Sequence, residues 1–183
     1  MVNSCLVALL LVAPALSGAQ TAPATQPAGK MKELAADDGK SAGKMSAAGG
    51  GHAIAFDAPG AGFALTGVRV FGSRYGTPDP PAEDFHVFLL DGDGKTLKDF
   101  AFPYKTFLRG EPRWVTLKVD PTPLPPGKFF ICLGFNPERT KGVYVHYDSS
   151  PDGDSRIGLP GSMNDAAKGD WMIRAIIAKD KER

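Results

Sequence analysis

The chain has 183 residues and a formal net charge of +1 at neutral pH. Charges of both signs are interspersed, so the sequence offers no electrostatic footprint for nucleic acid or anionic lipid, and neither is expected as a partner. Hydrophobic residues make up 43% of the chain, which is enough for a sizeable core.

The N-terminus has the pattern of a signal peptide. Cys5 to Leu16 is an unbroken apolar run of about a dozen residues, too short to span a bilayer. Small residues follow it, although no Lys or Arg precedes it, and cleavage is expected between Ala19 and Gln20. No later stretch is long enough for a transmembrane helix. We therefore expect export, to the periplasm or beyond it.

Cleavage would remove Cys5 and leave Cys132 as the one remaining cysteine. A mature chain with a single thiol forms no internal disulfide, so its fold must depend on the hydrophobic core. Cys132 lies in an apolar run and is expected to be buried rather than reactive.

Residues 20–51 are predicted to be a flexible linker. They are rich in Ala, Gly, Pro, Thr and Ser, lack aromatic residues and end in three glycines. Such a composition buries too little apolar surface to offset the entropy of ordering. The expected organisation is a signal peptide over 1–19, a linker over 20–51 and a folded domain over 52–183.

From His52 onward, short apolar runs alternate with Gly, Pro and Asp, which is the pattern of an all-β protein. We expect an antiparallel β-sandwich of jelly-roll type with about eight strands. The runs are Ala53–Phe56, Leu65–Phe71, Phe85–Leu90, Thr96–Phe102, Trp114–Val119, Phe129–Phe135, Val143–Tyr147 and Trp171–Ala178. Two connections, 72–84 and 148–170, are long, and long loops on a sandwich frequently carry binding sites.

Strand alternation selects the candidate ligand-binding residues. Tyr144 and His146 should face away from the core, and Trp114 should share its face with polar residues. Arg74 and Tyr75 fall in the first long loop and could bind an acidic or sugar ligand. The alternatives are that Trp114 is covered by the loop before it, and that Arg74 serves ordinary loop packing.

Three carboxylates, Asp148, Asp152 and Asp154, cluster after the run that ends at Tyr147. Closely spaced carboxylates on a loop can hold Ca²⁺, although the spacing is not that of an EF-hand. The alternative is that these aspartates only build turns.

The common catalytic motifs for zinc, phosphate and serine-nucleophile chemistry are missing from the sequence, so no enzyme is expected. A site built from His52, His86 and His146 stays open, since ligands distant in sequence can converge in space. Strand histidines with satisfied hydrogen bonds are the alternative.

The segment Lys128–Tyr147 and the ending Gly169–Arg174 resemble the late strands of secreted bacterial jelly-roll modules. The resemblance implies a galactose-binding-like or carbohydrate-binding-like sandwich, often an accessory to a catalytic domain. The leading hypothesis is an exported, non-catalytic module that binds a glycan or another envelope component. A structural or protein-binding envelope protein and a small secreted hydrolase are the alternatives.

The signal peptide gives the first testable prediction. The exported protein should begin at Gln20, because the peptidase reads the small residues before it. Intact-mass measurement of the exported protein checks this. Retention of Met1, or the added mass of a diacylglycerol group, would contradict it.

Overall fold

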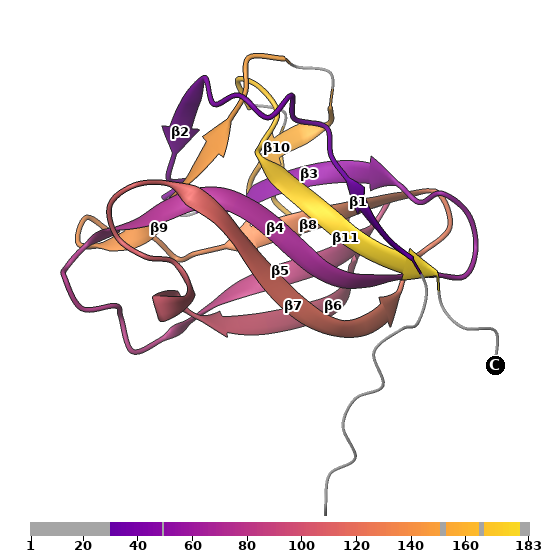
Figure 1. Ribbon diagram of the computed structural model, residues 1–183, viewed down its shortest axis with the longest axis horizontal. Coiled ribbons are helices and arrows are strands. Elements are labelled where there is room, and N and C mark those ends of the chain that lie inside the picture. The colour runs from indigo at the N-terminus through magenta and orange to yellow at the C-terminus, as the bar shows by residue number, and fades with distance from the viewer. Residues whose placement is uncertain (1–29, 49, 151–152, 165–166, 180–183) are drawn as a thin grey trace, which may run out of the picture.

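The computed structural model describes residues 30–48, 50–150, 153–164 and 167–179. The expected signal peptide and Asp152 lie outside these ranges. The described chain folds into two antiparallel sheets packed face to face, with no α-helix among the described residues (Figure 1). Accordingly, this part of the chain holds no helix that is long and apolar enough to cross a bilayer. The predicted all-β sandwich is confirmed.

The two sheets contain six and five strands, three more in total than the eight predicted. The first sheet contains β1 (Met31–Leu34), β2 (Gly43–Met45), β4 (Phe63–Gly76), β7 (Arg113–Pro123), β9 (Lys141–Tyr147) and β11 (Ile173–Lys179). The second contains β3 (His52–Asp57), β5 (Asp84–Asp91), β6 (Thr96–Pro103), β8 (Lys128–Gly134) and β10 (Ser155–Ile157). A single 3₁₀ turn, Tyr104–Thr106, precedes β7.

Strand β4 organises the first sheet. It pairs with β7 along one edge, and with β11 and then β9 along the other. Its core side carries Leu65, Val68 and Val70, which are fully buried between the sheets. Because side chains alternate along a strand, the residues between these point to solvent on the outer face.

Apolar side chains from both sheets fill the space between them. Trp171 is fully buried there. Cys132 is also buried, on the other side of β8, where it packs with Phe130 and Leu90. The Cys132 thiol is therefore a packing group, and burial raises its pKa to about 12.

The prediction of a flexible linker over 20–51 is wrong for the described residues of that range. Strand β1 pairs with β11 at one edge of the first sheet, and β2 pairs with β9 at another (Figure 1). We call residues 30–48 the N-terminal strap. Composition misled the prediction because these strands lie at sheet edges, where most of their bonding partners come from elsewhere in the chain.

Specific polar contacts hold the strap to the sandwich. The Arg174 guanidinium contacts the Asp37 carboxylate at 2.6 Å, and the Asp37 side chain is fully buried. The backbone N–H of Asp38 donates to Asp148 at 2.8 Å, and Ala42 N–H donates to the Tyr147 carbonyl at 2.9 Å. The strap is thus part of the folded domain.

The long connections are also shorter than predicted. Strand β4 continues to Gly76, so Arg74 and Tyr75 are strand residues, and not loop residues as the sequence suggested. The stretch 148–170 contains β10, which pairs with β3. Both corrections reflect pairing with distant strands, which local turn signals do not reveal.

Removing the strap should destabilise the domain. A chain that begins at His52 loses two strands and leaves Arg174 without Asp37. We expect its thermal midpoint to lie roughly 10 °C below that of a chain beginning at Lys30, for a loss of about 3 kcal/mol. Calorimetry of the two chains checks this. Equal midpoints would restore the linker interpretation.

A histidine lies in the core beside the strap. His52 is 1% exposed, and its Nε2 lies 3.1 Å from the Met45 carbonyl oxygen. Its ring meets Trp171 edge-on, with the centroids 4.7 Å apart. Burial lowers the pKa of His52 from 6.5 to about 4, because water no longer solvates the charged form.

This burial predicts acid sensitivity. Below pH 6.5 His52 takes up a proton in the unfolded chain but not in the folded chain. The free energy of unfolding therefore falls as the pH drops toward 4. From pH 7 to pH 5 the free energy of unfolding should fall by about 2 kcal/mol. Urea titrations at several pH values should show that the free energy of unfolding depends less on pH in His52→Leu than in the wild type. A flat wild-type profile would contradict the burial of neutral His52.

Candidate functional site

The outer face of the first sheet carries a group of rings from three strands. Phe71 of β4 lies 5.4 Å from Trp114 of β7 and 5.0 Å from His146 of β9, measured between ring centroids. Tyr75 and Tyr144 lie 4.5 Å apart on the same face. We call these five residues the aromatic platform. All are half-buried except His146, which is 8% exposed.

Strand register places the platform on this face. Phe71 pairs directly with Trp114, and Ser73 pairs with Tyr144. The neighbours of these residues along each strand, such as Val70, Val115 and Val145, are core residues. The hydrophobic core therefore fixes which side chains face solvent.

Charged groups frame Trp114. The guanidinium carbons of Arg174 and Arg69 lie 4.2 and 4.9 Å from the centroid of its ring. Both arginines contact the Glu33 carboxylate, at 2.8 and 2.7 Å. Partial burial raises the pKa of Glu33, but the hydrogen bonds from Arg174 and Arg69 outweigh it and hold that pKa below 4.5. Trp114 thus sits in a fixed and charge-compensated frame.

The strap completes the other end of the platform. The Ser41 hydroxyl lies 2.6 Å from Nδ1 of His146, and Nζ of Lys44 lies 4.7 Å from the Tyr144 ring centroid. Burial, and then the charge of Lys44, lower the pKa of His146 below 6.5. Both effects disfavour the charged form of the His146 ring.

Several contacts hold the ring of Tyr75 against that of Tyr144. The Tyr75 ring lies over Gly142, where an added Cβ would collide with it, and Gly142 has a φ of 154°. The Tyr75 hydroxyl donates to the Glu138 carbonyl at 2.9 Å and lies 3.1 Å from the Ser46 hydroxyl. These contacts fix the ring that packs against Tyr144.

The structure brings together four of the five predicted ligand-binding residues: Trp114, Tyr144, His146 and Tyr75. Arg74 is placed apart from them. It lies on the opposite side of β4, is 5% exposed, and donates to the carbonyls of Thr77, Pro78 and Asp79. Arg74 therefore shapes the turn after β4, in keeping with the loop-packing alternative.

Sequence reasoning missed Phe71 and Lys44. Phe71 ends an apolar run that looked like core, and its pairing with Trp114 shows that it faces outward. Lys44 lies in the range interpreted as linker. The alternation of β4 beyond Val70 was a usable signal for Phe71, whereas nothing local pointed to Lys44.

Two of the aspartates predicted to bind metal, Asp148 and Asp154, have hydrogen-bond or ion-pair partners within the protein. Asp148 is fully buried, and its carboxylate accepts hydrogen bonds from the backbone N–H groups of Asp38, Ser150 and Asp170. Asp154 forms ion pairs with Arg156 and Lys128 at 2.9 and 3.1 Å. The hydrogen bond from Arg156 outweighs burial and, with Lys128, lowers the pKa of Asp154.

The described residues therefore do not fit a calcium site. Asp148 builds a turn, as the alternative to metal binding proposed, and Asp154 is neutralised by two cations. Within the described ranges no cluster of three metal-ligating side chains occurs. Asp152 lies outside those ranges.

The three histidines do not converge. His52 is in the core, His146 belongs to the platform, and His86 lies on the second sheet, where it contacts Asp99 at 2.8 Å. The close Ser41–His146 pair has the elements of a nucleophile and a base. However, Nε2 of His146 has no hydrogen-bond partner among the described residues, so no carboxylate orients the ring as serine hydrolases require.

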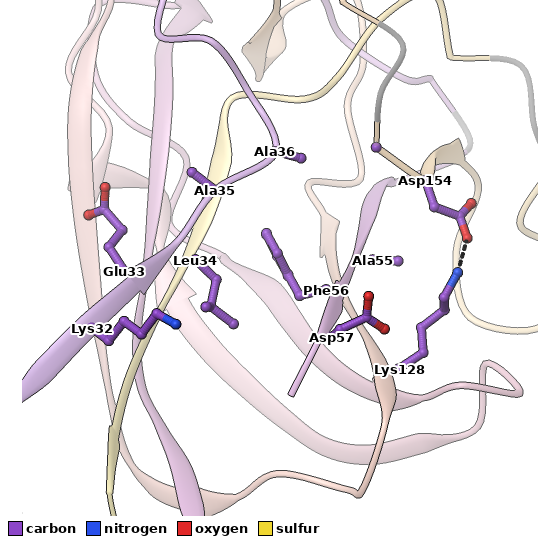
Figure 2. A pocket seen from close by; sticks show the side chains of 11 residues that line it. Lys32, Glu33, Leu34, Ala35, Ala36, Ala55, Phe56, Asp57, Lys128 and Asp154 are labelled. Carbon is purple, nitrogen blue, oxygen red and sulfur yellow. Dashed lines mark hydrogen bonds and ion pairs between the residues drawn. The ribbon is translucent and has the colours of Figure 1, made fainter. Parts of the chain in front are cut away.

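A groove of about 660 Å³ lies at an open side of the sandwich, between the β1 edge and β3 (Figure 2). Leu34, Ala36 and Phe56 form its apolar part and pack against the core. Its rim is charged, and the Lys128–Asp154 ion pair spans one side (Figure 2). Phe56, the one aromatic side chain in its lining, is 7% exposed.

Comparison with known proteins supports the fold. No family model matches the chain, and no curated protein matches it. Two solved structures of Cwp84 do match. One contains the cysteine protease and lectin-like domains of this surface layer associated protein of Clostridium difficile, at a TM-score of 0.58 and 14% identity.

That match covers 85% of this chain and 37% of the Cwp84 chain. The other structure, of the clostridial cysteine protease Cwp84 after propeptide cleavage, matches at a TM-score of 0.57 and 14% identity, over 82% and 40% of the respective chains. This chain thus spans less than half of the chains it matches. At 14% identity the likeness establishes a shared sandwich architecture.

Proposed function

We propose that this chain is an exported, non-catalytic β-sandwich module that binds a glycan on the aromatic platform. The observation that carries the proposal is the gathering of Phe71, Tyr75, Trp114 and Tyr144 on one solvent-facing sheet surface. Sugar rings present apolar C–H faces, which pack on aromatic rings, and hydroxyls, which need polar partners nearby.

Polar groups beside the rings supply partners for the sugar hydroxyls. Ser41, Ser46 and the Tyr75 hydroxyl lie at one end of the platform, and Arg69 and Arg174 lie at the other. The rings are held by strand pairing and by the strap, so little entropy is lost when a ligand orders them. A preformed surface of this kind favours binding.

The groove beside β1 is a weaker candidate for the glycan. Its one ring, Phe56, is buried in the core and offers no stacking surface. Its charged rim groups include a Lys128–Asp154 pair that a sugar would have to displace. The platform combines half-buried rings on the outer face of the sheet with polar neighbours, which the groove does not.

The resemblance to a structure that contains a lectin-like domain of a surface layer associated protein supports both the ligand class and the export. The absence of an orienting carboxylate beside the Ser41–His146 pair, within the described residues, supports a binding role rather than hydrolysis.

Truncating the platform should weaken glycan binding without unfolding the domain. Trp114→Ala or Tyr144→Ala should each weaken binding about 30-fold, the effect of removing an aromatic group that anchors an interface. A glycan array followed by calorimetric titration of the best ligand measures this. Thermal melts of each variant show whether the fold is intact.

Thr116→Ala is the matched control, since Thr116 is exposed on the same face of β7 but is not part of the platform. It should bind as the wild type does. If Trp114→Ala and Tyr144→Ala fold and bind normally, the site is elsewhere. If the wild type binds no glycan at all, the ligand class is wrong.

A further inference from the structure

Charge is distributed unequally along the aromatic platform. At the Trp114 end, the two cations Arg69 and Arg174 are matched by the two carboxylates of Glu33 and Asp37, at contacts of 2.6–2.8 Å. A ligand at that end meets a frame whose charges already cancel. Neutral hydroxyls suit such a frame better than an acidic group, which would have to compete with Glu33 and Asp37.

The Tyr144 end differs because of Lys44. This lysine pairs with His146 in the β2–β9 register, is exposed, and places Nζ over the Tyr144 ring. No carboxylate among the described residues lies within ion-pair distance of it. The charge of Lys44 contributes to the lowered pKa of His146.

Two carboxylates beside the first residue of β9 pair with a different cation, Lys141. Glu83 and Glu138 contact Nζ of Lys141 at 2.5 and 3.2 Å. The Glu138 backbone carbonyl, and not its carboxylate, accepts the Tyr75 hydroxyl. Lys44 is thus a cation beside a stacking ring whose charge no described side chain neutralises.

We propose that Lys44 and Tyr144 form a subsite for an anionic unit of the bound glycan. The sugar ring packs against the Tyr75–Tyr144 pair, and its carboxylate or phosphate pairs with the Lys44 ammonium. The inference rests on the proposed function and adds to it a ligand class, which is an acidic rather than a neutral glycan. Lys44 acts as a specificity-determining residue.

A paired glycan array tests the subsite. Each carboxylated glycan is printed beside its carboxyl-reduced form, and each phosphorylated glycan beside its dephosphorylated form, so that members of a pair differ only at the acidic group. The wild type should prefer the charged member of the bound pairs, more strongly at low salt than at high salt. Whether the carboxylated or the phosphorylated pairs show the preference identifies the anion.

Lys44→Gln should reduce the preference two- to fivefold, as expected for an exposed ion pair, and Lys44→Arg should keep it. Lys118→Gln is the control, because Lys118 is exposed on the outer face of β7 and has no ring contact among those described. It should leave the preference unchanged.

Equal binding of charged and uncharged members would overturn the subsite and leave the proposed glycan function standing. So would an equal loss of preference in the Lys44→Gln and Lys118→Gln variants, which would mean non-specific attraction. Binding to no glycan in any pair would contradict the proposed function and the subsite together.

Discussion

The contact between Arg174 and Asp37 links three parts of the molecule that are far apart in sequence. Arg174 belongs to β11, which lies between β1 and β4 in the first sheet, and Asp37 belongs to the strap. The same guanidinium contacts Glu33 and covers the Trp114 ring. Because the Asp37 side chain is fully buried, removing Arg174 would leave its carboxylate charge without compensation, at a cost of roughly 3–5 kcal/mol.

This contact explains why the strap and the platform depend on each other. The strap brings Ser41 and Lys44 to one end of the platform, and its carboxylates fix the arginines at the other end. The hydrogen bonds that Arg174 donates to Asp37 and to Glu33 outweigh partial burial and raise the pKa of Arg174. Without the strap, the rings of β4, β7 and β9 would lose their polar frame.

The sequence predicted the parts of the fold that depend on local pattern. Alternation in β7 and β9 placed Trp114, Tyr144 and His146 on the outer face, because burial of Val115, Val143 and Val145 fixes the face of their neighbours. Cys132 was predicted to be buried because it lies in an apolar run, and it is buried.

The sequence did not predict features that depend on partners distant in the chain. The strap has the composition of a linker, and its strands exist because β11 and β9 offer open edges. Arg74 looked available in a Pro-rich stretch, but the continuation of β4 turned it toward three carbonyl groups. Asp148 looked like a metal ligand because it lies close to other aspartates in the sequence. The local sequence did not reveal the hydrogen bond that its carboxylate accepts from the backbone N–H of Asp38.

The central claim is that ligand binds the outer face of the first sheet, and the two tryptophans test it most directly. Trp114 belongs to the platform, whereas Trp171 is fully buried and its indole N–H donates to the Arg156 carbonyl at 2.9 Å. In ¹⁵N-labelled protein their two indole signals can be followed while an oligosaccharide selected on the array is added. The account predicts that the Trp114 signal shifts with saturation and that the Trp171 signal stays in place. A saturable shift of backbone signals around Phe56 and Lys128, with Trp114 unmoved, would place the ligand in the groove beside β1 and contradict it.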